Sequence, residues 1–153
     1  MKKFVAVLLA AMLCLSFAAC GGEKATDKTV DAAAMFKTLL TDVTYTDNAT
    51  ELDSSMAGVL LGGELPDGTE AYLAANDSAY LRCAVFACKD KDAAAAVKKL
   101  IQTYIDDSID AKYNVDEVAL LQNAKIHSMG NYVAVAVTSD IDNVNKVIDQ
   151  YFA

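Results

Sequence analysis

The chain has 153 residues and a formal net charge of −8, with 13 basic and 21 acidic side chains. The phosphate backbone of a nucleic acid demands a basic footprint, and here the lysines are scattered among acids. The composition therefore excludes nucleic acid as an expected partner, and it disfavours electrostatic binding to anionic lipid.

The N-terminus has the layout of a secretory signal peptide. Lys2 and Lys3 precede an uncharged apolar run from Phe4 to Phe17, and two alanines follow. The run is about fourteen residues long, whereas a membrane-spanning helix needs roughly twenty. We therefore expect residues 1–19 to be a cleaved signal peptide, with a retained transmembrane anchor as the minor alternative.

The segment F17-A-A-C-G-G22 resembles the lipobox of bacterial lipoproteins, with Phe17 where that motif usually has leucine. The resemblance implies that Cys20 is lipidated on its sulfur and becomes the mature N-terminus. A diacylglycerol thioether carries two acyl chains, which suffice for stable anchoring. We expect an exported protein on the outer leaflet of the cytoplasmic membrane. The alternative is ordinary cleavage near Ala19, which leaves Cys20 free.

Residues 20–29 follow as a lipidated tether, because GGEKATDKT contains no aromatic or branched aliphatic side chain that could bury apolar surface. Loss of the signal peptide removes two lysines and no acid, so the mature chain carries a net charge near −10. Residues 30–153 contain enough Val, Ile, Leu and Ala for the core of one domain.

The first half of this domain predicts two helices and two strands. Apolar spacing predicts a helix over residues 30–40 and a short helix over residues 52–61, which ends at a pair of glycines. The only proline lies in the loop that follows. Residues 69–75 and 80–88 have the composition of strands, and a turn-forming Asn-Asp-Ser sequence separates them.

The second half predicts a long helix, a hairpin and a final helix. Residues 91–111 form the strongest amphipathic pattern in the chain, and residues 115–122 add one or two helical turns. Gly130-Asn131 predicts a two-residue turn that pairs Ile126 with Val135 and Ser128 with Val133. A helix-start signal at residues 139–142 then precedes an apolar stripe that ends at Phe152.

The order of these elements predicts an α+β fold. We expect an antiparallel sheet of about four strands with helices on one face, and a ferredoxin-like arrangement is one candidate topology. Cys83 and Cys88 lie five residues apart on one strand, so their Cα atoms are separated by about 16 Å and no disulfide can join them. Strand parity places Cys83 in the core with Leu81 and Val85, and it places Cys88 on the opposite face with Phe86.

The same parity predicts a face that points away from the core and could contact a ligand. Its residues come from two predicted strand pairs and are Tyr80, Arg82, Phe86, His127 and Tyr132. Arg82, the only arginine, suits a bidentate contact with a carboxylate or phosphate. The alternative is that the aromatic side chains pack across strands and that Arg82 pairs with a nearby acid.

The sequence contains no recognisable catalytic motif, so we expect neither an enzyme nor a cofactor or metal site. His127 is the only histidine, and a single imidazole with two separated thiols is a poor basis for a triad or a zinc site. Paired carboxylates can hydrolyse glycosides. However, the pairs Asp106-Asp107, Asp90/Asp92 and Asp140/Asp142 fall at expected helix starts or on helix faces.

Taken in order, five features resemble one family of small Gram-positive lipoproteins, known only as domain of unknown function 4358. They are F17-A-A-C-G-G22, E51-L-D-S-S-M56, A84-V-F-A-C-K-D90, a long alanine-rich helix, and M129-G-N-Y-V-A-V-A-V137 before a terminal helix. The resemblance implies a cellular location and a fold, and it implies no catalytic residues. We expect a noncatalytic domain that contacts an envelope protein or cell-wall ligand. An envelope hydrolase that uses paired carboxylates and a structural accessory without a ligand are the alternatives.

Overall fold

The computed structural model describes residues 29–111 and 114–153. The predicted signal peptide and all of the predicted tether except Thr29 lie outside these residues. The strands are β1 (Thr50–Leu52), β2 (Glu70–Ala75), β3 (Leu81–Ala87), β4 (Lys125–Met129) and β5 (Tyr132–Ala136). The helices are α2 (Ala32–Asp42), α3 (Met56–Leu61), α4 (Lys91–Ala111), α5 (Val115–Asn123) and α6 (Ile141–Phe152).

The strands form one sheet in the order β1-β2-β3-β5-β4, and every neighbouring pair is antiparallel. The predicted α+β class is therefore confirmed. The ferredoxin-like arrangement is found only in part. The chain leaves β3 through α4 and α5 and forms the edge strand β4, which is parallel to β3, and it then returns between these two strands as β5, antiparallel to both. The second helix-to-strand crossover of that fold is missing from the described residues, because no strand follows α6 there and β2 instead joins β3 as a hairpin.

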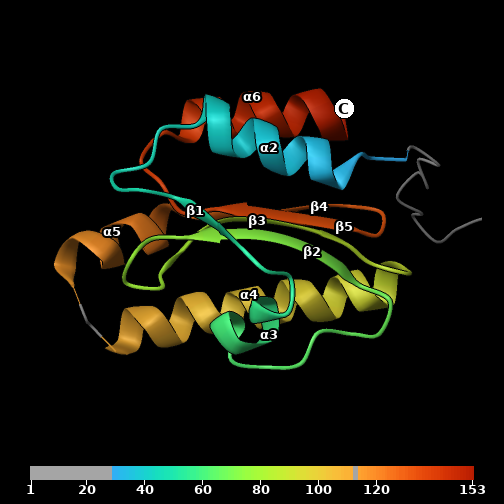
Figure 1. Ribbon diagram of the computed structural model, residues 1–153, viewed down its shortest axis with the longest axis horizontal. Coiled ribbons are helices and arrows are strands. Elements are labelled where there is room, and N and C mark those ends of the chain that lie inside the picture. Colours follow the sequence, from blue (N-terminus) through green and yellow to red (C-terminus); the bar gives the residue numbers. More distant parts are fainter. Residues whose placement is uncertain (1–28, 112–113) are drawn as a thin grey trace, which may run out of the picture.

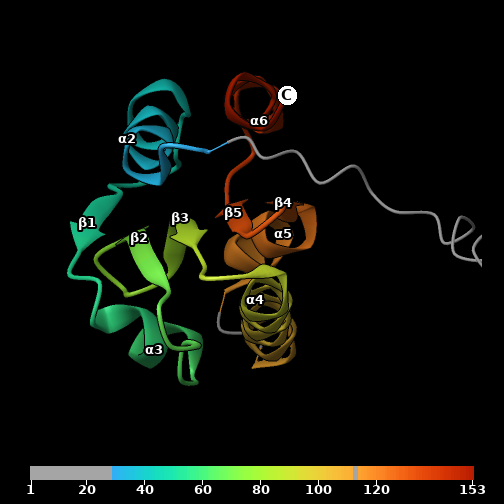
Figure 2. The ribbon, with the colours of Figure 1, turned by 90° about the vertical axis from the view of Figure 1, so that its right-hand side faces the viewer.

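Helices cover both faces of the sheet, rather than the one face that the sequence predicted. Figure 1 and Figure 2 show α2 and α6 above the sheet, with α3 and α4 below it. Each side has its own core: Phe36 and Val147 pack with Cys83 on the α2–α6 side, whereas Val97 and Leu121 pack with the sheet on the α3–α4–α5 side.

The reason is that the central strands are apolar on both faces. Every residue of β3 from Leu81 to Phe86 is buried, and so is every residue of β5 after Tyr132. Alternation marks a strand with one solvated face, whereas a continuous apolar run marks a strand covered on both sides. Many of these positions are alanine, so no alternating polar side chains mark one face of the sheet as exposed to solvent.

Local sequence accounts for the boundaries of most elements. Asp31 caps α2 by accepting a hydrogen bond from the backbone nitrogen of Ala34 at 2.9 Å. Gly130 adopts φ +58°, and the hairpin pairs Ile126 with Val135 and Ser128 with Val133, as predicted. The edge strand β1 was not predicted, and the short helix begins at Met56 rather than near Leu52. Three residues are too few to display a strand pattern.

The thiols of Cys83 and Cys88 are both free and buried, so the predicted absence of a disulfide between them is confirmed. They lie in the two opposite cores, with Val85 beside Cys83 and Phe86 beside Cys88, as strand parity required. Leu81 is an exception, since it belongs to the core of Phe86 and not to that of Cys83. A shift in strand register, described below, is the cause.

The turn between β2 and β3 holds the one described non-glycine residue with positive φ, Ala79 at +61°. Asn76 closes this turn, because its backbone nitrogen donates to Tyr80 O at 3.0 Å and its side-chain oxygen accepts from two backbone nitrogens. The turn therefore imposes a left-handed conformation on a residue that carries a Cβ atom, at a cost of about 1 kcal/mol.

We predict that Ala79→Gly raises the free energy of unfolding by about 0.5–1 kcal/mol, because glycine adopts this conformation without strain. Ala95→Gly is the matched control. Ala95 is exposed within α4, so the same change should lower the free energy of unfolding by about 1 kcal/mol. Urea denaturation measures both values, and an equal loss of stability in the two variants would contradict the strained turn.

Candidate functional site

The five residues predicted to form a ligand-contacting face do not share an exposed face. Arg82 is 1% exposed, and Phe86 is fully buried in the core between the sheet and α4. Tyr132 is half-buried on the opposite, α2–α6 side of the sheet. His127 is half-buried on the edge strand β4, and Tyr80 is half-buried in the turn before β3. The prediction that these residues form one exposed face is therefore wrong, because helices cover both faces of the sheet.

Arg82 departs from regular strand geometry at a shift in register between β2 and β3. Ala74 lies opposite Cys83 and Ala75 lies opposite Leu81, so Arg82 has no Cα partner on β2. An extra residue of this kind bends the strand and redirects side chains. The alternation assumed from the sequence therefore fails at this point, and Leu81 moves into the other core.

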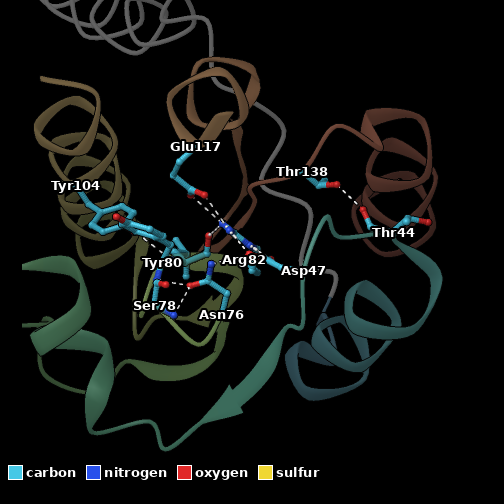
Figure 3. Close-up of polar contacts among 10 residues, drawn as sticks. Thr44, Asp47, Asn76, Ser78, Tyr80, Arg82, Tyr104, Glu117 and Thr138 are labelled. Carbon is cyan, nitrogen blue, oxygen red and sulfur yellow. Dashed lines mark hydrogen bonds and ion pairs between the residues drawn. The ribbon is translucent and has the colours of Figure 1, made fainter. Parts of the chain in front are cut away.

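The side chain of Arg82 is held between two carboxylates (Figure 3). Asp47, in the loop after α2, accepts from Nε at 2.6 Å and from Nη2 at 2.9 Å. Glu117, in the first turn of α5, accepts from Nη1 and from Nη2, both at 2.8 Å. The remaining N–H of Nη1 donates to the carbonyl of Leu81 at 3.2 Å. The alternative that Arg82 pairs with nearby acids is therefore the observed arrangement.

These contacts use all five N–H donors of the guanidinium group, which leaves none for an external carboxylate or phosphate. Burial alone disfavours the charged arginine. The hydrogen bonds and charges of Asp47 and Glu117 outweigh that effect and raise the pKa of Arg82. The Arg82 cluster, which we define as Asp47, Arg82 and Glu117, is accordingly a structural ion network and not a vacant binding site.

Further hydrogen bonds position the loop that carries Asp47. The side-chain nitrogen of Asn76 donates to Asp47 Oδ2 at 2.6 Å. Thr138 donates its hydroxyl hydrogen to the carbonyl oxygen of Thr44 (Figure 3). The backbone nitrogen of Thr44 donates to Asp140 Oδ2 at 2.9 Å. The loop between α2 and β1 is thereby tied to the turn before β3 and to the start of α6.

Two surface hollows flank the beginning of β2. One, of about 380 Å³, lies between the start of α2 and the sheet, and we call it the tyrosine hollow. Asp31, Glu70, Tyr72, Cys88 and Tyr132 are among the residues that line it. The other, of about 400 Å³, is lined by residues from Ser54 to Tyr72 and shares Glu70 and Tyr72 with the first.

The thiols and the histidine are poorly placed for chemistry. Burial raises the pKa of Cys83 to about 12, so the reactive thiolate is scarce at neutral pH. Burial also raises the pKa of Cys88. The pKa of His127 is lowered by burial and by the charge of Lys125, and its Nε2 atom has no hydrogen-bond partner among the described residues. Within residues 29–111 and 114–153, no group of three or more His, Cys, Asp and Glu side chains could hold a metal ion.

Residues 66–138 match the family model described as Domain of unknown function (DUF4358). This segment of the chain is therefore similar to that family. It runs from the loop before β2 to the segment between β5 and α6. It therefore contains Arg82 and Glu117 but not Asp47. The helices α2, α3 and α6 and the strand β1 lie outside it. Comparison with curated proteins and with solved structures gave no match. The family resemblance inferred from the sequence is confirmed for residues 66–138, whereas the features at residues 17–22, at residues 51–56 and in the terminal helix lie outside the match. The match assigns no activity.

Sequence reasoning singled out Arg82 but missed the residues that surround it. Asp47 and Glu117 each lie 35 positions away from Arg82, on opposite sides of it in the chain. No periodic pattern links residues at that separation. The only usable signal was the presence of a single arginine in an apolar strand, because a buried guanidinium group requires acidic partners.

We predict that Arg82→Met lowers the free energy of unfolding by about 3 kcal/mol, because it leaves Glu117 as a buried and unpaired carboxylate. The double variant Arg82→Met/Glu117→Met should recover most of that loss, since apolar residues of similar volume often replace a buried ion pair without net cost. Urea denaturation of both variants measures the difference. A double variant no more stable than the single one would contradict this account.

The Arg82 cluster also predicts a specific dependence of stability on pH. Hydrogen bonds from Arg82 lower the pKa of Asp47 from 3.8 to about 2. A lowered folded-state pKa stabilises the protein above pH 3.8, and this contribution is lost as the pH falls towards 2. Because the Asp47 side chain is 40% exposed, solvent screening limits the effect to about 1 kcal/mol. The difference in unfolding free energy between wild type and Asp47→Asn should shrink over this pH range, and a constant difference would contradict the prediction.

Proposed function

We propose that the protein is an exported lipoprotein, held at the outer leaflet of the cytoplasmic membrane by lipid on Cys20, whose domain binds an envelope protein or cell-wall ligand without catalysis. The observation that carries the proposal is the junction F17-A-A-C-G-G22 at the end of a short apolar run. Two acyl chains on one sulfur would make the attachment stable.

The start of the folded domain supports a tether of this kind. Val30 is buried, with 5% of its surface exposed, and Asp31 caps α2, so ordered packing begins directly after the proposed tether. A tether of about ten residues reaches no more than about 35 Å when fully extended. The domain would therefore work close to the membrane surface. Among the described residues, no helix has both the length and the apolar character needed to span a membrane.

The state of the potentially reactive groups supports a noncatalytic role. Two of the carboxylates considered for a hydrolase have structural partners. Asp90 accepts from the backbone nitrogen of Ala93 at the start of α4 at 2.8 Å, and Asp140 accepts from the backbone nitrogen of Thr44. Cys83, a possible nucleophile, is a buried thiol with a raised pKa. These groups take part in the fold, and we therefore favour a binding role over a catalytic one.

We predict that Cys20→Ala releases the protein from the membrane or stalls it as the unprocessed precursor. The physical reason is that the variant lacks the sulfur that would carry the acyl chains. Membrane fractionation followed by intact-mass analysis measures the outcome. Cys14→Ala is the matched control, because it removes a thiol from the same apolar segment and should leave processing unchanged.

The lipoprotein proposal also predicts the mass of the mature protein. The mature wild-type protein should be heavier than the chain from Cys20 to Ala153 by the mass of its lipid. A Cys20→Ala variant that stays in the membrane fraction as a processed species, with the same mass as wild type apart from the substitution, would refute the proposal.

A further inference from the structure

The tyrosine hollow combines two carboxylates with two aromatic side chains. Asp31 lies at the start of α2, Glu70 and Tyr72 lie on β2, and Tyr132 lies at the start of β5. They come from three different parts of the chain, and the sheet and α2 bring them to one concave surface. Its volume of about 380 Å³ is within the range of small-molecule sites.

The hollow is negatively charged and has no internal cation to neutralise it. Neither Asp31 nor Glu70 has an ion-pair partner among residues 29–111 and 114–153. Lys89 lies near the rim, where its side-chain carbons approach Gly68. The pKa of Tyr72 is raised by burial and by the charges of Glu70 and Asp31, so both carboxylates act on the same phenol.

The walls of the hollow are held in place before any ligand arrives. The ring of Tyr72 lies 6.2 Å from that of the buried Phe36, and its hydroxyl group donates to Glu70 Oε2 at 3.4 Å. Asn131 fixes the position of Tyr132, because its backbone oxygen accepts from Cys88 N at 2.8 Å and its side chain donates to Cys88 O. Rigid walls reduce the entropy that binding must overcome.

Asp31 is also fixed, yet it keeps capacity for a ligand. Its Oδ1 atom accepts from the backbone nitrogen of Ala34, and its Oδ2 atom remains available as an acceptor. Glu70 likewise uses only Oε2 in its contact with Tyr72. Two residues that line the hollow, Asp31 and Glu70, therefore each keep one carboxylate oxygen that is not used in these hydrogen bonds, and Tyr72 and Tyr132 supply aromatic walls beside them.

The chemistry of these groups selects the charge and type of ligand. Two unpaired carboxylates repel phosphate and other anions. A hard divalent cation prefers six or more oxygen ligands, whereas this hollow offers aromatic walls that suit the carbon skeleton of an organic cation. We propose that the tyrosine hollow binds the ammonium group of a small organic amine, with Asp31 and Glu70 accepting its hydrogen bonds and Tyr72 and Tyr132 packing against its carbon skeleton.

This inference rests on the proposed binding role, but it is independent of the lipid on Cys20. An ammonium group at the envelope can belong to an amino sugar or to an ethanolamine lipid headgroup. The headgroup carries a phosphate beside its ammonium group, which the two carboxylates would repel. We therefore favour an amino sugar, and the two sources are separated by experiment.

The test is a titration of the purified full-length chain, labelled with ¹⁵N and kept in detergent, with glucosamine and with the neutral N-acetylglucosamine. We expect glucosamine to shift the backbone signals around Asp31, Glu70 and Tyr132, with at least tenfold weaker binding of N-acetylglucosamine. The double variant Asp31→Asn/Glu70→Gln should weaken glucosamine binding about tenfold, as the loss of two charge contacts predicts.

The chosen substitutions preserve the fold. Asparagine caps a helix as well as aspartate does, and glutamine has the shape of glutamate. The control Glu64→Gln/Asp106→Asn removes the same charge at two exposed positions outside the hollow. Its glucosamine affinity should equal that of wild type. Urea denaturation checks that both double variants remain folded.

Equal binding of the two sugars, or an unchanged affinity in the Asp31→Asn/Glu70→Gln variant, would overturn the proposal. Vesicles that contain phosphatidylethanolamine test the lipid source by co-sedimentation. Binding to them that depends on Asp31 and Glu70, without glucosamine binding, would support the ammonium site and assign it to lipid. Because these measurements use purified protein, a failure here leaves the fractionation result for Cys20→Ala unaffected.

Discussion

The buried charge of Arg82 is the constraint on which one end of the molecule depends. A guanidinium group with 1% of its surface exposed requires every N–H to be bonded. The partners come from the loop after α2, from α5, and from the backbone of β3 itself. The register shift next to Ala75 directs this side chain away from regular pairing. Loop, strand and helix are therefore positioned by one side chain.

A second constraint is that the sheet is buried on both faces. Small residues such as Ala74, Ala84 and Ala134 let helices approach the sheet closely from either side, and each face contributes to a separate core. The helices α2 and α6, which cover one face, lie outside the segment that matches the family model. The match thus covers four of the five strands and the helices α4 and α5, and it does not extend to the helices on the other face of the sheet.

The Arg82 cluster and the tyrosine hollow lie at opposite ends of β3. Arg82 lies at the start of β3, whereas Cys88 follows the end of the same strand and lines the tyrosine hollow. In the Arg82 cluster every N–H donor of the guanidinium group is occupied. The tyrosine hollow, in contrast, has two carboxylates without a cationic partner among the described residues. The hollow also lies beside Val30, where the proposed tether enters the domain. A ligand bound there would be held close to the membrane surface.

The sequence by itself determined the α+β class, the hairpin register of Ile126 with Val135, and the separation of Cys83 from Cys88, because these depend on local periodicity and turn chemistry. It also determined the family resemblance. Only the tertiary structure decided that helices cover both faces, since alanine and valine fit either side of a sheet. Only the tertiary structure brought Asp47 and Glu117 to Arg82, and Asp31 to Glu70, because pairing between charges far apart in the chain follows from the packing of whole elements and leaves no periodic trace in the sequence.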